Sequence, residues 1–89
     1  MKYKLSRVNN YKRSFKKIKL NDEEELAYID VLYKLLNDET LDEKYKDHQL
    51  KGNFDGCKEC HIKPDLLLIY KIKEEAIELI DIGTHSDLF

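Results

Sequence analysis

Long apolar runs are absent from this 89-residue sequence. No stretch approaches the roughly 20 apolar residues that a membrane-spanning helix needs. Residues 1–7 carry positive charges, but the hydrophobic core of a signal peptide does not follow them. We therefore expect a cytoplasmic protein that makes no membrane contact and whose two cysteines, Cys57 and Cys60, are reduced thiols.

Proline, glycine and low-complexity sequence are also scarce. The chain contains one proline and three glycines, and no segment is rich in Pro, Gly or Ser. This composition provides neither a flexible linker nor a repeat that would divide the chain. A chain of 89 residues can bury one modest core, and a hydrophobic content of 42% is ordinary for a folded domain. We therefore predict a single domain over residues 1–89.

A net positive charge, which is common in RNA-binding proteins, is missing as well, because the net charge is −2. The distribution is uneven, however. Residues 1–20 contain eight Lys or Arg and no acid, residues 21–47 contain three basic and ten acidic residues, and residues 48–89 contain five and eight. Attraction acts over a Debye length of roughly 8–10 Å, so only the basic N-terminal fifth would attract phosphate groups. Solvated helix faces would explain the same charge runs without any partner.

The periodicity of the apolar residues predicts an α+β fold. Two early segments have helical spacing, and Asn21 and Glu24 have the spacing of a capping box at the start of the second. The expected elements are a strand at 2–7, helices at 9–20 and 22–38, a polar loop at 39–56, strands at 57–63, 66–73 and 76–82, and a short tail at 84–89. This β-α-α-β-β-β order fits a small, mainly antiparallel sheet with both helices on one face.

All three histidines, His48, His61 and His85, lie in the second half of the chain, in loops or at strand ends. Histidine can both accept and donate a proton near neutral pH. Metal-free RNA cleavage needs a base for the 2′-OH proton, an acid for the departing 5′-oxygen and a cation for the phosphate. The three imidazoles are therefore candidate acid–base groups, although histidines scattered over a surface are common without any shared site.

Strand alternation over residues 57–63 places Glu59 and His61 on one face and Lys58 and Cys60 on the other. After the turn at Pro64, Asp65 would open the next strand close to His61. A carboxylate beside an imidazole orients the ring. An exposed strand face with incidental charges is the alternative interpretation.

The segment from Cys57 to His61 also has the C-x-x-C-H pattern of c-type haem attachment. That attachment takes place outside the cytoplasm, and Met1, the only methionine, supplies no nearby axial ligand. A zinc site made of Cys57, Cys60, His61 and another histidine is a better metal alternative. Residues 57 and 60 point to opposite faces of an extended strand, however. Cys60 would then be a buried core thiol and Cys57 incidental.

Three segments in this order and spacing resemble the YafQ-like branch of the RelE toxin superfamily: DHQLKG at 47–52, ECHIKPDLLLIY at 59–70 and GTHSDLF at 83–89. The resemblance covers essentially the whole chain, and the predicted α+β fold is similar to that of the family. It implies the toxin of a type II toxin–antitoxin pair. Such proteins are ribosome-dependent endoribonucleases, or mRNA interferases, that inhibit translation and are silenced by a cognate antitoxin.

The resemblance also implies a set of site residues without any cofactor or metal. The catalytic set is His48, His61, Asp65, His85, Phe89 and Glu59, and Lys51 and Lys58 are expected to contact phosphate. His85 would be the general base or acid, His48 and His61 would share the proton transfers, Glu59 and Asp65 would position imidazoles, and Phe89 would stack on a base. The expected partners are the antitoxin, acidic where it covers this surface, the ribosome and mRNA, and operator DNA only through the antitoxin complex.

Two positions depart from the family pattern. Many relatives carry Arg where this chain has Lys58 and Asp81. Lys58 keeps the charge but loses the bidentate guanidinium, and Asp81 reverses the charge. A toxin homologue that has lost catalysis and only binds its antitoxin is therefore one alternative, and a small zinc-binding module is another.

Overall fold

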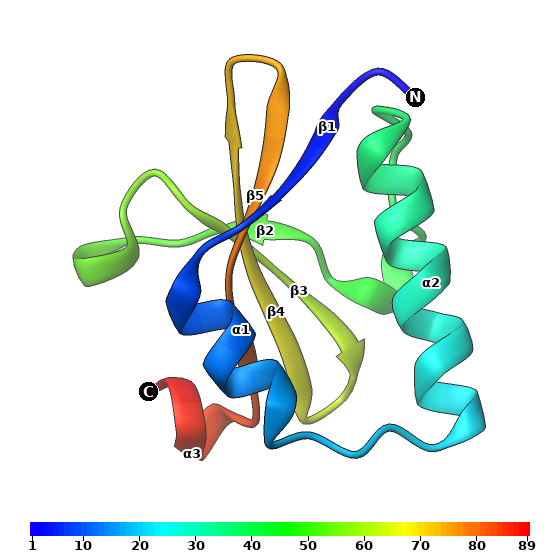
Figure 1. The fold of residues 1–89 in the computed structure, drawn as a ribbon, viewed down its shortest axis with the longest axis vertical. Helices are drawn as coiled ribbons and strands as arrows, with labels where there is room; N and C mark the ends of the chain where they lie inside the picture. The colour runs from blue at the N-terminus through cyan, green and yellow to red at the C-terminus, as the bar shows by residue number, and fades with distance from the viewer.

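Three long antiparallel strands from the second half of the chain form the centre of the sheet in this computed structural model, which describes all residues 1–89. They are β3 (Lys58–Lys63), β4 (Leu66–Lys73) and β5 (Ala76–Gly83). Two short strands complete the sheet in the order β1-β5-β4-β3-β2 (Figure 1). The edge strand β1 (Lys4–Arg7) runs parallel to β5, and β2 (His48–Gln49) runs antiparallel to β3. The predicted α+β fold with a mainly antiparallel sheet is confirmed.

Two helices follow β1, as expected. Helix α1 spans Asn9–Lys16 and helix α2 spans Asp22–Leu36. The predicted capping box is present, because Oδ1 of Asn21 accepts the N–H of Glu24 at 2.8 Å and Oε1 of Glu24 accepts the N–H of Asn21 at 2.9 Å. The predicted helix 9–20 is too long at its C-terminal end. Asn21 must be extended to cap α2, so the chain leaves the first helix before it reaches this residue.

The core lies between the helices and one face of the sheet. Tyr11 of α1 and Val31 of α2 are 2% and 0% exposed, and they belong to one cluster with buried side chains of β3, β4 and β5. The sheet residues of this cluster are Cys60, Ile62, Leu66, Leu68, Tyr70, Ile77, Leu79 and Ile82. No helix is long and apolar enough to cross a bilayer.

A β-bulge changes the pattern of faces within β5. Tyr70 pairs with Leu79, but the preceding residue Ile69 pairs with Asp81, so Ile80 is an extra residue in β5. Ile77 and Leu79 lie in the core, and Ile82 returns to the core after the bulge. Strict alternation would place Asp81 on the same face as Leu79. The bulge instead places Asp81 on the opposite face of the sheet.

The predicted loop 39–56 and tail 84–89 contain ordered elements that the periodicity did not reveal. The loop forms η1 (Glu43–Tyr45), β2 and η2 (Gly52–Phe54), and the tail forms helix α3 (His85–Leu88). These elements span only two to four residues, too few for a hydrophobic period. Helix α3 nevertheless has a local signal, because Thr84 and Asp87 form a capping box.

Candidate active site

The face of β3 that points away from the core carries Glu59 and His61. Their neighbours Cys60 and Ile62 belong to the core cluster, so alternation turns Glu59 and His61 to the opposite side. In the sheet register, Glu59 pairs with Ile69 and Ile69 pairs with Asp81, while His61 pairs with Leu67. The strand β2 brings His48 directly opposite Glu59.

Glu59 joins two of the three histidines. Its Oε1 lies 3.3 Å from Nε2 of His48 and 3.4 Å from Nε2 of His61. The other ring nitrogens face backbone carbonyl oxygens: Nδ1 of His48 lies 2.6 Å from the oxygen of Lys46, and Nδ1 of His61 lies 3.3 Å from that of Pro64. A carbonyl only accepts, so both Nδ1 atoms carry the proton. A hydrogen bond from either Nε2 to an ionised Glu59 then requires a second proton on that ring.

The buried carboxyl group of Glu59 is only partly satisfied. Glu59 is 4% exposed, and its Oε2 is buried without a hydrogen-bond partner. A buried carboxylate costs free energy unless it is paired, and the partners of its Oε1 are the Nε2 atoms of His48 and His61. The cluster of His48, Glu59 and His61 can therefore hold and exchange protons.

His85 has a different environment. Its Nδ1 lies 2.8 Å from Oδ1 of Asp65, and its backbone N–H donates to the same oxygen at 2.9 Å. These hydrogen bonds, the backbone one first, hold the pKa of Asp65 below its usual range, so the carboxyl group is ionised and accepts from Nδ1. Nε2 of His85 makes no hydrogen bond or ion pair, and it is the one unpartnered imidazole nitrogen in the chain.

The three imidazoles form a row with His61 at its centre. The ring centroids of His48 and His61 are 6.1 Å apart, and those of His61 and His85 are 5.7 Å apart. His48 lies at one end of the row, with both ring nitrogens paired, and His85 lies at the other end, with its Nε2 free. The structure thus brings together His48, Glu59, His61, Asp65 and His85. The bonding partner of Asp65 is His85, whereas the sequence suggested His61.

Phe89 contacts an aromatic residue that the sequence analysis missed. The rings of Phe54 and Phe89 meet edge to face with centroids 5.6 Å apart. Phe89 is 64% exposed, so its ring remains open to a stacking partner. Phe54 lies in η2, within a polar segment. In the sequence, the only indication of its role was that it is an isolated aromatic residue between two glycines.

The two predicted phosphate-contacting lysines are not both near the histidines. Lys58 points to the helix-covered side of the sheet, where its Nζ pairs with Asp47 at 3.1 Å and lies 5.9 Å from the ring centroid of Tyr70. Alternation separates it from Glu59, so the structure does not place Lys58 among the histidines. Lys51 is exposed and precedes η2.

The residues that could hold a metal ion are His48, Glu59 and His61. One ligand atom from each lies within 4.8 Å of the others, and the group contains no cysteine. Cys60 is fully buried in the core, and burial raises the pKa of its thiol to about 12. The alternative zinc site built on Cys57 and Cys60 is therefore wrong in its ligands, because Cys60 points into the core.

Comparisons with known proteins identify relatives of this chain. A 45-residue segment, 51% of the chain, is 42% identical to the mRNA interferase toxin YafQ of Escherichia coli (strain K12). The match spans 49%, about half, of that protein's length.

Two solved structures are similar over nearly their whole length. A copper-bound mutant toxin from Helicobacter pylori is 37% identical, with a TM-score of 0.89 over 98% of this chain and 99% of that one. The Escherichia coli DinJ–YafQ toxin–antitoxin complex contains a chain that is 30% identical, with a TM-score of 0.78 over 100% of this chain and 99% of that one.

The residues that match a known family include the whole candidate site. The family described as "Bacterial toxin of type II toxin-antitoxin system, YafQ" matches residues 3–89, a span that includes all three histidines, Asp65 and Phe89. The family match covers nearly the whole chain, and the fold is similar to that of a solved YafQ structure. This chain therefore belongs to the YafQ family of type II toxin–antitoxin toxins.

Proposed function

We propose that this chain is a ribosome-dependent endoribonuclease that cleaves mRNA by metal-independent acid–base catalysis and thereby inhibits translation. The observation that carries the proposal is the unpartnered Nε2 of His85, a ring that Asp65 orients and that lies next to the ring of His61, which in turn lies next to that of His48. The relative from Escherichia coli is named an mRNA interferase toxin.

The geometry supports different roles for the three histidines in the reaction. A base removes the proton from the 2′-OH, the 2′-oxygen attacks the phosphorus, and the bond to the 5′-oxygen breaks as an acid gives that oxygen a proton. His85 serves as base or acid through Nε2, since its Nδ1 is occupied by Asp65. His48 and His61 share the other transfer and contact the phosphate. The products are a 2′,3′-cyclic phosphate and a 5′-hydroxyl.

Two further features suit an RNA substrate. The exposed ring of Phe89 is available for stacking on a base, which contributes roughly 1–3 kcal/mol per base in single-stranded complexes. Exposed basic residues of α1, including Lys12, Arg13 and Lys16, together with Lys51, would meet ribosomal or messenger phosphates. Lys58 is withdrawn from direct phosphate contact because it is paired with Asp47.

The antitoxin part of the proposal is supported by apolar side chains on the outer face of α2. Leu26, Ile29 and Tyr33 are 68%, 54% and 56% exposed, and they recur at helical spacing. A related chain is solved in complex with the antitoxin DinJ. We propose a cognate antitoxin as the partner, acidic where it covers the basic surface. The toxin would reach operator DNA only through that complex, and it would act in the cytoplasm on ribosomes.

The test is cleavage of a defined mRNA on programmed ribosomes. The parent should cut the ribosome-bound message and leave the free message largely intact. A chelator of transition metals that spares the ribosome's Mg²⁺ should have no effect, and the new 3′ ends should resist ligation until the cyclic phosphate is opened and the remaining phosphate is removed. Equal cutting of free mRNA would refute ribosome dependence, and loss of cutting with the chelator would refute metal independence. The exposed neighbour variant Ser86→Ala is the matched control for His85→Ala.

A toxin homologue without catalysis is the second candidate. Asp81 favours it, because the bulge in β5 turns Asp81 to the same face as Glu59, with Ile69 between them. A carboxylate there would repel a phosphate. Induced expression separates the two candidates: the nuclease should arrest growth unless the antitoxin is co-expressed, whereas a binding-only protein should not arrest growth at all.

A further inference from the structure

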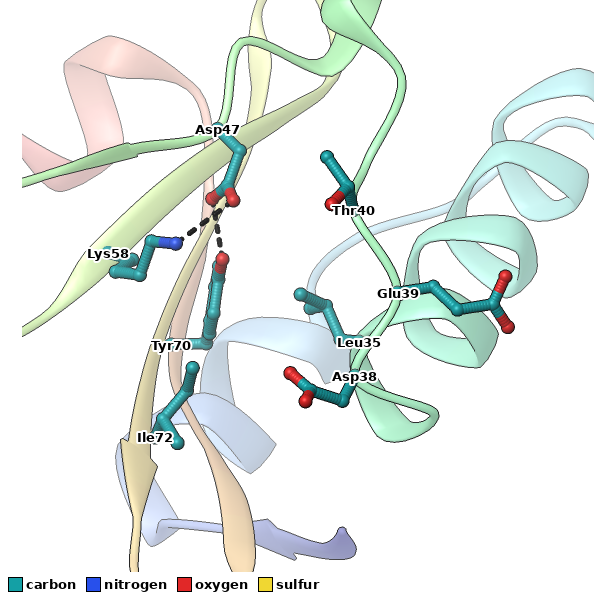
Figure 2. A pocket seen from close by; sticks show the side chains of 8 residues that line it. All are labelled: Leu35, Asp38, Glu39, Thr40, Asp47, Lys58, Tyr70 and Ile72. Atoms are coloured by element: carbon teal, nitrogen blue, oxygen red, sulfur yellow. Dashed lines mark hydrogen bonds and ion pairs between the residues drawn. The ribbon is translucent and has the colours of Figure 1, made fainter. Parts of the chain in front are cut away.

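On the helix-covered side of the sheet, Asp47 ties three segments of the chain together. One carboxylate oxygen accepts the hydroxyl of Tyr70 at 2.5 Å, and the other lies 3.1 Å from Nζ of Lys58 (Figure 2). These side chains line a pocket of about 250 Å³ that also includes Leu35 and Ile72. Tyr70 is fully buried, so its hydroxyl has a fixed position from which to hold Asp47.

The residue after Asp47 is His48, which faces the other side of the sheet. The strand β2 contains only His48 and Gln49, and they pair with Glu59 and Lys58 respectively. Asp47 and His48 therefore bind neighbouring residues of β3 from opposite sides: Asp47 binds Lys58, and His48 binds Glu59. A strand of two residues has few backbone hydrogen bonds, so side-chain contacts must contribute much of what holds it in register.

We infer that Asp47 is a positioning residue, which holds β2 so that the ring of His48 stays against Glu59. The inference rests on the proposed function, in which His48 takes part in proton transfer. Asp47 itself does not touch the substrate, because it lies on the side of the sheet opposite the histidines.

The backbone conformation just before β2 depends on the contacts that Asp47 makes. Lys46 has a positive φ of 48°, which a non-glycine residue adopts only when its surroundings hold it there. Its carbonyl oxygen accepts Nδ1–H of His48. Burial, and then the hydrogen bond to Asp47, raise the pKa of Tyr70, so its hydroxyl remains a donor. Without Asp47, Lys46 and His48 can relax together, and displacement of a catalytic group by about 1 Å can cost about 100-fold in rate.

The test combines single-turnover cleavage with a double-mutant comparison. Asp47→Ala should lower the maximal rate by about 10–100-fold, with a smaller change in the substrate concentration needed for half that rate. Tyr70→Phe, which removes only the hydroxyl, should lower it less. The matched control is Glu39→Ala, because Glu39 lines the same pocket but its carboxylate points away from Asp47 (Figure 2), and it should cleave like the parent.

The background variant His48→Ala separates positioning from general damage. In that background Asp47→Ala should have no further effect on the rate, since the group that it positions is gone. Equal losses in both backgrounds would overturn the inference, and so would no loss in the parent background when His48→Ala itself slows cleavage. Should Asp47→Ala fail to fold, Tyr70→Phe carries the same comparison.

An NMR measurement keeps this inference distinct from the proposed function. The ¹⁵N signals of the His48 ring should report a protonated Nδ1 in the parent and in Glu39→Ala, and they should shift in Asp47→Ala. If His48→Ala cleaves as fast as the parent, the proposed role of His48 fails, yet the shifted ring signals still support positioning by Asp47. Unchanged ring signals in Asp47→Ala would refute it.

Discussion

Asp65 accepts two hydrogen bonds from His85 on one oxygen, one from the ring Nδ1 at 2.8 Å and one from the backbone N–H at 2.9 Å. The pair joins the turn before β4 to the first residue of α3. Because both donors belong to one residue, the carboxylate fixes the position of the backbone and the orientation of the ring together. The result is an imidazole whose Nε2 remains free for proton transfer.

His85→Ala should therefore lower the rate of cleavage of ribosome-bound mRNA by about 10²–10⁴-fold, the usual effect of losing an acid–base group. Asp65→Asn should also slow the reaction, because an amide can present its NH₂ group to Nδ1 and favour the wrong tautomer. Single-turnover kinetics measure both. Melting curves should show that His85→Ala remains folded, because its side chain is exposed. Full cleavage by a folded His85→Ala protein would remove His85 from the mechanism.

The stability of the Asp65–His85 contact should depend on pH in the acid range. The pKa of Asp65 is lowered from its ordinary value of 3.8, so the contact stabilises the fold above that value and loses this effect as the pH falls further. The free energy of unfolding of the parent should exceed that of Asp65→Asn at about pH 7, and the difference should shrink towards about pH 3. Urea unfolding measures it, with Asp55→Asn as the exposed control. A difference that is constant with pH would contradict this.

Transition metals should inhibit the proposed RNA cleavage. A Zn²⁺ or Cu²⁺ ion held by His48, Glu59 and His61 would occupy the Nε2 atoms and the carboxylate that exchange protons. Added ion should stop cleavage, and a chelator should restore it. Calorimetry should show that Glu59→Gln weakens binding of the ion, whereas Cys57→Ser leaves it unchanged. Faster cleavage with bound metal would contradict metal-independent catalysis.

Asp81 should slow the reaction of the natural chain. It lies two strands from Glu59, a separation of about 9–10 Å, on the face that would receive the phosphate. For a phosphate held at a similar distance from Asp81, screened repulsion amounts to about 1 kcal/mol, or roughly fivefold in rate. Asp81→Asn should relieve it, and Asp81→Arg should speed cleavage further.

The opposite result for Asp81 is equally informative. Its Oδ1 accepts the N–H of Ile82 at 2.9 Å, so the side chain also supports the end of β5. Pairing with Lys58, which would have made Asp81 part of a catalytic ion pair, is excluded because Lys58 binds Asp47 on the other face. Slower single-turnover cleavage by both Asp81 variants would refute the repulsion. Slower cleavage by Asp81→Arg alone would show that this support of β5 matters more, because the amide oxygen of Asn can accept the same N–H.

Local sequence patterns were sufficient for the main elements and for most of the geometry of the candidate site. The capping box at Asn21 placed the start of α2, because its two hydrogen bonds involve residues only three positions apart. Alternation over β3 correctly separated Glu59 and His61 from Cys60, since successive side chains of a strand always point to opposite faces. The three histidine segments identified the family that the comparison over residues 3–89 confirms.

Tertiary structure decided the features that depend on residues far apart in the sequence. The bulge at Ile80 reverses the face of Asp81, and it arises from pairing with β4 rather than from any period within β5. The hydrogen bond between Asp65 and His85 forms only because the fold brings α3 beside the turn before β4. The anchoring of β2 by Asp47 required a buried tyrosine 23 residues away. Hydrophobic periodicity records which side of an element is buried, and it carries no information about which distant polar groups meet across the sheet.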